Sequence, residues 1–233
     1  MLEGSSAGSV LSVNVSAEKG TAKTPVDLAV INMHGIKDDA HAGNWHRQIS
    51  LLASEKVREF EEELGQTIKP GEFGENITTQ GIALHRVAVL DRIQVGVTTL
   101  EVTQIGKECH GDGCAIFQAV QKCVMPSDGI FCRVLDGGEV VPGAAISWLP
   151  RVRKFRVVTL SDRAARGEYK DLSGPRIRNL IEEHFAGSRW QTEISGTVLP
   201  DDVQLLRQEL VRCRDQGVDF VITTGGTGIG PRD

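Results

Sequence analysis

The hydrophobic pattern of the chain changes near Pro150, and this change constrains the fold more than any other feature. Before Pro150, short β-branched segments alternate with glycine-containing turns, as in "SVLSVNVS", "VAVLDRIQVG", "TTLEVTQIG" and "VVPGAAISWL". Many short strands separated by such turns favour a β-barrel or a β-sandwich. After Pro150, strand-like segments alternate with segments of helical periodicity, which favours a mostly parallel α/β sheet. We therefore predict an α+β chain of two domains, residues 1–150 and residues 151–233.

One helix is expected within the first domain, in the segment "SLLASEKVREFEEELG". Val57, Phe60 and Leu64 recur there at helical spacing. Ser54 is placed to cap the amino end of this helix, and Gly65 is placed to end it. We expect the helix to cover one end of a barrel.

The second domain is predicted to contain three buried strands, "FRVVTL", "TEISGTVL" and "VDFVIT". Two helices are predicted between them, which gives a three-layer arrangement. Ser173 is placed to cap the first helix, with Pro175 in its first turn, and Cys213 falls on the apolar face of the second. The sequence ends at Asp233, after a glycine-rich loop that no helix follows. We therefore expect a truncated domain, and the sequence leaves open whether Asp233 is the natural end.

The composition narrows the class of protein. The net charge is −5 and no basic run occurs, which argues against a nucleic-acid-binding surface. No apolar stretch approaches the roughly 20 residues that span a bilayer. The first residues lack the basic and apolar regions of a signal peptide. We therefore expect a cytoplasmic protein without a membrane partner, in which thiols stay reduced.

Four of the five cysteines lie within residues 109–132, which favours a metal site or thiol chemistry over a disulfide framework. The candidate ligands of a structural zinc site are Cys109, His110, Cys114 and Cys123. Their spacings of four and eight intervening residues lack the Cys-x-x-Cys pattern typical of such sites. Cys123 and Cys132 have apolar neighbours and are expected to be structural.

Cys109 is also a candidate reactive thiol. It follows a predicted strand in the glycine-rich loop "GKECHGDGC", with Lys107 two residues before it. A nearby cation favours the thiolate, which is both the nucleophile and the metal ligand, whereas Glu108 opposes it. From the residues alone, the zinc and reactive-thiol interpretations both stay open.

The segments "GIKDDAHAGNWHRQISLL", "PGEFGENITTQGIAL" and "LEVTQIGKECH" resemble the MOSC domain, the C-terminal domain of molybdenum cofactor sulfurases. The resemblance implies a β-barrel and makes Cys109 the sulfur-carrying residue. It implies that Cys109 receives sulfur as a persulfide from a pyridoxal-phosphate-dependent cysteine desulfurase and passes it to a molybdenum-bound pterin, or contacts molybdenum directly. Cys114 is then a second thiol that resolves the persulfide or makes a second metal contact.

Polar residues near these segments are candidates for binding the cofactor. Arg47 has the fork geometry that binds a pterin phosphate. Alternatively, Asp39, His41 and Arg47 hydrogen-bond one another to hold a loop, and Asn76 caps a turn. The resemblance places "FGENITT" in the same pocket. The candidate cofactor-binding residues of this domain are His41, Arg47, Glu75, Asn76 and Lys107.

The loop "VITTGGTGIG" follows the last predicted strand. Successive glycine amides form a nest for phosphate, although a glycine-rich loop can also be only a tight turn. Together with "TLSDRAARGEYKDLSGP" and "VLPDD", it resembles the molybdopterin-binding domain of the molybdopterin adenylyltransferase type. The resemblance implies pterin-phosphate binding with ATP and Mg²⁺, in which Asp201 and Asp233 hold the metal or orient the reacting phosphate. The candidate residues are Ser161, Asp201, Gly225, Gly226, Thr227, Gly228 and Asp233.

The two resemblances point to one molybdenum cofactor biosynthesis protein. A sulfur-transferring barrel is joined to a molybdopterin-binding segment, and the expected partners are the desulfurase and molybdoenzyme clients. Because the second domain is expected to be incomplete, we do not predict adenylyl transfer by this chain alone. An open sheet edge also favours a homo-oligomer. The alternatives are a non-catalytic carrier of the cofactor and a zinc-stabilised or redox-sensing barrel.

Overall fold

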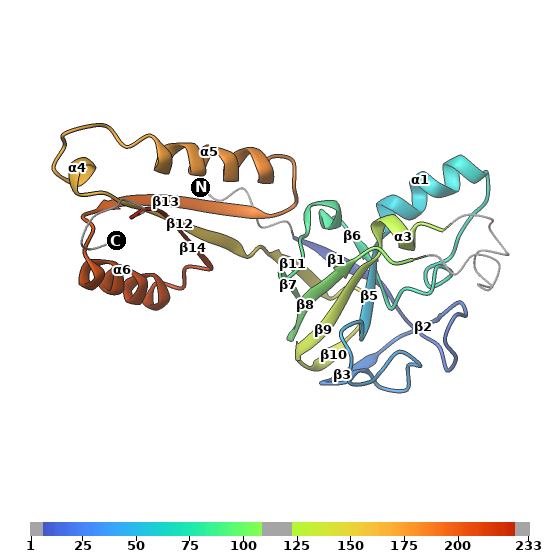
Figure 1. Cartoon of the computed structure of the whole chain (residues 1–233). Helices are drawn as coiled ribbons and strands as arrows, with labels where there is room; N and C mark the ends of the chain where they lie inside the picture. Colours follow the sequence, from blue (N-terminus) through green and yellow to red (C-terminus); the bar gives the residue numbers. More distant parts are fainter. Residues whose placement is uncertain (1–6, 109–122, 227–233) are drawn as a thin grey trace. The chain divides into compact units, whose positions relative to one another are not determined.

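The computed structural model describes residues 7–108 and 123–226 (Figure 1). The chain folds as two compact units, Met1–Arg151 and Val152–Asp233. Within the described residues, no helix is long and apolar enough to cross a membrane.

The first unit is built on a closed ring of seven strands, counted within the part of the chain that the structure describes. The order around the ring is β11-β7-β8-β9-β5-β6-β1, and β1 pairs back with β11. The ring strands are β1 (Ala7–Val15), β5 (Ile49–Ala53), β6 (Ile77–Gln80), β7 (Arg92–Val95), β8 (Thr98–Ile105), β9 (Ile130–Asp136) and β11 (Ala145–Leu149). Neighbours are antiparallel except β5 and β6, which run parallel. The predicted β-barrel is therefore confirmed.

Four shorter strands complete the first unit. β2 (Thr24–Val26) pairs with the end of β1. β10 (Gly138–Val140), β3 (Ala29–Asn32) and β4 (Gly35–Ile36) form a separate small sheet.

Apolar side chains on alternate strand positions fill the ring. The most deeply buried of them include Val13, Leu51, Ile77, Ile93, Leu100, Ile130 and Trp148. Asp91 fixes one end of this core, because its carboxylate accepts hydrogen bonds from Trp148 Nε1 at 2.7 Å, Ala88 N at 2.8 Å and Arg151 N at 2.9 Å. The predicted strand "VAVLDRIQVG" starts only at Arg92, since the short 3-10 helix Leu84–Arg86 and a turn precede it.

Helix α1 (Ser54–Leu64) contacts β5 and β6, as expected for a helix over the barrel. Its carboxyl end is confirmed at Gly65, which adopts φ 67°. The prediction that Ser54 caps the helix is wrong. The N-cap is Ala53, without a side-chain cap, because β5 runs directly into the helix. Beneath α1 and the short helix α3 (Met125–Asp128) lies a second apolar cluster that includes Val57, Phe60, Phe73, Met125 and Phe131.

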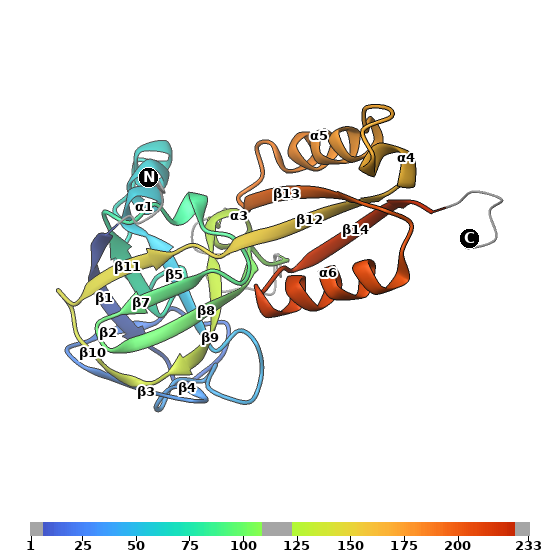
Figure 2. The ribbon, with the colours of Figure 1, turned by 90° about the vertical axis from the view of Figure 1, so that its left-hand side faces the viewer.

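The second unit is a parallel sheet of β13 (Gln191–Leu199), β12 (Val152–Leu160) and β14 (Phe220–Gly225), with β12 in the centre. Helices α5 (Ser173–Phe185) and α6 (Val203–Asp215) lie on opposite faces of it (Figures 1 and 2). Alternation along β12 explains this arrangement. Val157 packs in one cluster with Ile181 of α5, whereas Arg156 bonds Glu209 of α6. The predicted three-layer α/β arrangement is confirmed.

Acidic side chains cap the two long helices. Asp202 accepts hydrogen bonds from the first amides of α6. The prediction that Ser173 caps α5 is wrong, because the carboxylate of Asp171 accepts from the amides of Ser173 and Gly174 instead. Cys213 is 2 % exposed, as expected for a core residue of α6.

Candidate functional site

A buried ion pair lies beside the loop that follows β4. Lys23 Nζ donates to Asp39 Oδ2 at 2.5 Å, and neither side chain is exposed. The backbone amides of Ser16 and His41 also donate to the Asp39 carboxylate. Lys23 Nζ lies 3.3 Å from His41 Nδ1. The pair therefore fixes the position of the His41 ring, whose side chain is 29 % exposed.

The pKa values of both members of this pair are lowered, which favours the neutral form of Lys23 but the charged form of Asp39. The pKa of Lys23 is lowered, because desolvation outweighs its contact with Asp39. For Asp39, burial alone would raise the pKa, but hydrogen bonds from His41 and Lys23 bring it well below its usual value. The sequence left two interpretations of this loop: cofactor binding, or hydrogen bonds among Asp39, His41 and Arg47. The structure shows the hydrogen bond between Asp39 and His41. Lys23, which the sequence analysis did not single out, takes the place expected for Arg47.

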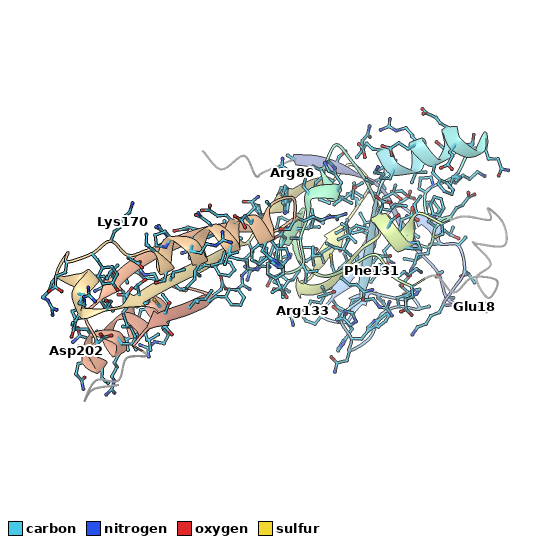
Figure 3. All side chains as sticks on the ribbon, turned by 45° about the horizontal axis from the view of Figure 1, so that its top comes forward. Glu18, Arg86, Phe131, Arg133, Lys170 and Asp202 are labelled. Carbon is cyan, nitrogen blue, oxygen red and sulfur yellow. The ribbon has the colours of Figure 1, made fainter. Side chains whose placement is uncertain are left out.

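Arg47 instead lies against aromatic rings. Its guanidinium carbon is 5.0 Å from the Trp45 ring centroid and 5.8 Å from that of Phe131, which is labelled in Figure 3. The His41 ring stacks on Trp45 at 6.3 Å. Arg47 Nε is buried without a hydrogen-bond partner among the described residues. A guanidinium held between two rings with an unsatisfied N–H is suited to bind an oxyanion.

Glu75 and Asn76 belong to a buried polar network. Glu75 Oε1 accepts from Gly71 N and from Thr78 Oγ1, both at 2.7 Å. Its Oε2 is buried without a partner in the described part of the chain, and burial raises the pKa of this carboxyl. Asn76 accepts from Ser50 N at 3.1 Å and donates to a backbone oxygen of β1. The Asn76 amide therefore ties ring strands together.

The end of β8 fixes the start of the cysteine loop. Gly106 N donates to Gly129 O at 2.8 Å, and Gln104 Nε2 donates to Gly106 O at 2.7 Å. Lys107, which follows, is half-buried. Cys109, His110 and Cys114 lie outside the described residues, so their predicted roles stay predictions.

The other thiols of this region are placed. Cys132 is buried in the ring, where desolvation raises its thiol pKa, and Cys123 packs on the apolar cluster beneath α1. The structural role predicted for Cys132 thus agrees with its burial. Across residues 7–108 and 123–226, the structure has no group of three His, Cys, Asp or Glu side chains that could hold a metal.

In the second unit, candidate residues gather at the carboxyl ends of the strands. Ser161 and Asp162 follow β12, and Asp201 follows β13. Asp162 N donates to Asp201 Oδ2 at 3.3 Å, and Asp201 N donates to Asp162 Oδ1 at 3.1 Å. Asp201 Oδ1 is buried and has no partner among the described atoms. Ligands of open α/β sheets bind at this edge.

The glycine loop closes against these residues. Gly225 adopts φ +90°, and a side-chain carbon there would lie 2.0 Å from Leu160 O. Gly226 lies beside Asp201, since a side-chain carbon on it would be 3.8 Å from Asp201 Oδ1. At Gly225 only glycine allows this approach, because any side chain would meet the Leu160 carbonyl. Thr227, Gly228 and Asp233 lie outside the described residues.

Asp171 is a residue of this region that the sequence analysis missed. Its carboxylate accepts from Thr159 Oγ1 at 2.8 Å as well as from the α5 amides. It lines a groove of about 320 Å³ together with Lys170, labelled in Figure 3, and Arg178. Burial alone would raise the pKa of Asp171, but hydrogen bonds from Gly174, Thr159 and Ser173 lower it. An aspartate two residues before Ser-Gly-Pro is a capping signal that could have identified it.

Known proteins resemble the two units separately. The family model described as "MOSC domain" matches residues 38–147, and the one described as "Probable molybdopterin binding domain" matches residues 156–233. YiiM from Geobacillus stearothermophilus is 26% identical with a TM-score of 0.50, covering 62% of this chain and 76% of that one. YuaD from Bacillus subtilis, at 19% identity, shares the fold with a TM-score of 0.52 and covers 62% of this chain and 96% of that one.

The second unit resembles the molybdopterin adenylyltransferase of Pyrococcus furiosus, with 42% identity over 84 residues. That match covers 36% of this chain and 46% of the relative. The chain spans less than half the length of the curated relatives that it matches in this region.

The two family matches relate this chain to molybdenum cofactor biosynthesis. The chain contains a MOSC domain, residues 38–147, followed by part of a molybdopterin-binding domain, residues 156–233.

Proposed function

We propose that the MOSC domain carries sulfur as a persulfide on Cys109 and delivers it to the molybdenum cofactor. The thiolate of Cys109 attacks the outer sulfur of a persulfide on the donor protein. The S–S bond of that persulfide breaks, and the donor cysteine leaves as a thiolate. The proposed donor is a pyridoxal-phosphate-dependent cysteine desulfurase, and the proposed recipients are molybdoenzymes that hold the cofactor.

The cations of the MOSC domain support a role in holding the anionic cofactor. Arg47 has an unsatisfied Nε and lies between two rings, a position suited to the phosphate of the pterin. Gly106 is held against the ring by its hydrogen bond to Gly129 O. Lys107 is the next residue and lies at the start of the loop that contains Cys109. In this proposal Cys109 is also the residue that contacts molybdenum, and Cys114 is the thiol that resolves the persulfide. The Cys114 thiolate attacks the inner sulfur, a Cys109–Cys114 disulfide forms, and the outer sulfur leaves as sulfide for the cofactor.

We further propose that the second domain binds molybdopterin at the carboxyl edge of its sheet. The glycine loop begins at this edge, where Gly225 lies close against Leu160. Successive glycine amides of such a loop suit a phosphate, and the sequence continues to Thr227 and Gly228. Mg²⁺ is commonly held by one or two carboxylates together with substrate phosphates. Asp162 and Asp201 fit that donor set, and the buried, unpartnered Oδ1 of Asp201 is an available ligand atom. Mg²⁺ would neutralise the phosphates of ATP there.

One observation carries the proposal: two compact units of one chain match two families named for the same cofactor chemistry. A shared cofactor explains their presence in one chain.

The sulfur-carrier proposal is tested by trapping persulfide on the chain. The protein is incubated with a cysteine desulfurase and cysteine, and alkylated peptides are then analysed by mass spectrometry. We expect one added sulfur atom on Cys109 in the parent chain and its loss in Cys109→Ser. Cys123→Ser is the matched control, since Cys123 is only half-buried, and it should label like the parent.

Other outcomes of this experiment distinguish the alternatives. A parent chain that binds molybdopterin but takes up no sulfur is a non-catalytic carrier. Stoichiometric zinc in the purified chain, removed by Cys109→Ser, identifies a zinc-stabilised barrel. Equal labelling of Cys109→Ser and the parent excludes Cys109 as the carrier.

A further inference from the structure

A groove of the second unit lies between α5 and the sheet and extends away from the carboxyl edge. Val157 of β12 and Gly196 of β13 pair with each other in the sheet, and both line this groove. They lie three residues before the strand ends at Leu160 and Leu199, which is about 10 Å along the strands. The glycine loop packs against Leu160. The inner part of the groove is therefore a different place from the candidate molybdopterin site.

Glycine residues on both walls shape this groove. A side-chain carbon on Gly174 of α5 would lie 2.4 Å from Asp171 Oδ2 and 2.7 Å from Thr159 Oγ1. On Gly196, such a carbon would lie 3.4 Å from Cδ and 3.5 Å from Nε of Arg178. The Arg178 side chain therefore lies over a strand position that has no side chain of its own. The volume of about 320 Å³ is at the lower end for small-molecule sites, so the groove suits a small ligand.

Arg178 is a half-buried cation in this groove. Among the described residues, its guanidinium has no hydrogen-bond or ion-pair partner. Arg156, which is half-buried on the opposite face of the sheet, has the usual arrangement, since Glu209 Oε1 lies 2.6 Å from its guanidinium. Removing a charge from water is costly unless an opposite charge accompanies it. A bound anion would give Arg178 what Glu209 gives Arg156.

Lys170, labelled in Figure 3, adds a second cation to the groove. It is exposed, and no described residue forms an ion pair with it. The carboxylate of Asp171 also lines the groove, but it accepts from Thr159 Oγ1 at 2.8 Å, Ser173 N at 3.0 Å and Gly174 N at 3.2 Å. Asp171 is thus bonded to uncharged donors, and the two cations are left for a ligand.

We propose that this groove binds a phosphomonoester with a small apolar organic group, as a site additional to the molybdopterin site. A phosphate monoester carries nearly two negative charges at pH 7, which matches the two cations. Arg178 supplies the planar fork that binds phosphate oxygens in pairs. Val157, Pro175 and Val198 give the organic group an apolar surface. Binding involves no covalent step.

Phenyl phosphate is the probe that tests this site, added to the full chain labelled with nitrogen-15. We expect saturable shifts of the Gly174 and Gly196 amide signals, with half-saturation at about 1–10 mM. Arg178→Gln should weaken binding at least about tenfold, because a charged hydrogen bond is lost. Gly196→Val fills the groove and should weaken binding as strongly. Arg176→Gln is the matched control and should bind like the parent, since Arg176 is an exposed arginine of the same helix that does not line the groove.

Two further probes separate the two parts of the ligand. Inorganic phosphate lacks the apolar group, and benzoate has one negative charge in place of two. Both should bind more weakly than phenyl phosphate. Benzoate that binds as tightly as phenyl phosphate would overturn the assignment to a phosphomonoester. Absence of shifts at Gly174 and Gly196 in a parent chain that is folded by circular dichroism would overturn the site itself.

The two ligand sites of this unit are distinguished by opposite variants. Gly225→Ala should lose molybdopterin and keep the phenyl phosphate shifts, whereas Arg178→Gln should lose those shifts and keep molybdopterin. If Arg178→Gln also releases molybdopterin, the groove is part of the pterin site and the proposal of an additional site fails. If the parent chain does not bind molybdopterin but shows the phenyl phosphate shifts, the proposed function fails and the groove site stands.

Discussion

Two buried carboxyl groups of the MOSC domain show how local partners set the charge of a residue. Asp39 and Glu75 are 5 % and 1 % exposed, and burial favours the neutral form of both. Asp39 stays ionised, because Lys23 and His41 bond to it. Glu75 accepts from uncharged donors, which include the Gly71 amide and the Thr78 hydroxyl, and burial raises its pKa. The two groups are therefore expected to respond to pH in opposite directions.

Replacing Glu75 by glutamine should reduce the pH dependence of barrel stability. A carboxyl with a raised folded-state pKa binds protons more tightly when folded, so it stabilises the fold at low pH. That contribution is lost as the pH rises from about 4.5 through the folded-state pKa. Urea unfolding followed by tryptophan fluorescence should show Glu75→Gln more stable than the parent at pH 7, by on the order of 1 kcal/mol. A variant whose stability falls with pH as steeply as that of the parent would contradict this role.

Asp91 should contribute more to the folding stability of the first unit than an exposed aspartate does. It is 2 % exposed and accepts three hydrogen bonds, from Trp148, Ala88 and Arg151. Asp91→Ala leaves these donors unsatisfied and should cost about 3 kcal/mol or more. The measurement is the midpoint of chemical unfolding of the first unit. Asp136→Ala, at the exposed end of β9, is the control and should cost less than about 0.5 kcal/mol.

At the scale of elements, the strands were predictable and several caps were not. Alternation in "SVLSVNVS" identified β1, because one face of that strand is buried in the ring. Ser54 and Ser173 have the right residue type for capping, but Ala53 is the N-cap of α1 and Leu172 is the N-cap of α5. The first amides of α5 donate instead to Asp171, one residue before that N-cap. Capping depends on the backbone conformation at a single residue, and this conformation cannot be predicted from the residue type alone.

Gly106 links the barrel to the cysteine loop, and a substitution there tests that link. It adopts φ +68°, and a side-chain carbon would lie 2.1 Å from Pro126 O. Gly96 also has a positive φ, +56°, but nothing lies within 4 Å of the added carbon. Gly96→Ala should therefore cost only about 1 kcal/mol, for its backbone angle. Gly106→Ala should cost clearly more and should reduce persulfide labelling of Cys109, as measured by unfolding and by mass spectrometry. Equal behaviour of the two variants would show that the contact with Pro126 is unimportant.

At the scale of the whole molecule, the sequence indicates the family of each unit better than the positions of its site residues. The change of pattern near Pro150 separates barrel from parallel sheet, and motifs such as "TGGTG" point to the molybdopterin family. The Lys23–Asp39–His41 cluster could not be predicted in the same way. Its members are brought together by the ring, and Lys23 lies 16 positions before Asp39 without a motif of its own.

The central claim is that molybdopterin binds at the carboxyl edge of the second sheet, and its retention by the full chain tests this most directly. Chain and molybdopterin are mixed without oxygen, the protein is separated by gel filtration, and the bound pterin is oxidised and counted by fluorescence. We predict near one pterin per parent chain and a loss of at least about tenfold in Gly225→Ala, whose added carbon meets Leu160 O at 2.0 Å. Gly217→Ala, also at positive φ but with open space around it, should bind like the parent. Equal pterin retention by Gly225→Ala and the parent, with both chains folded, would contradict the account.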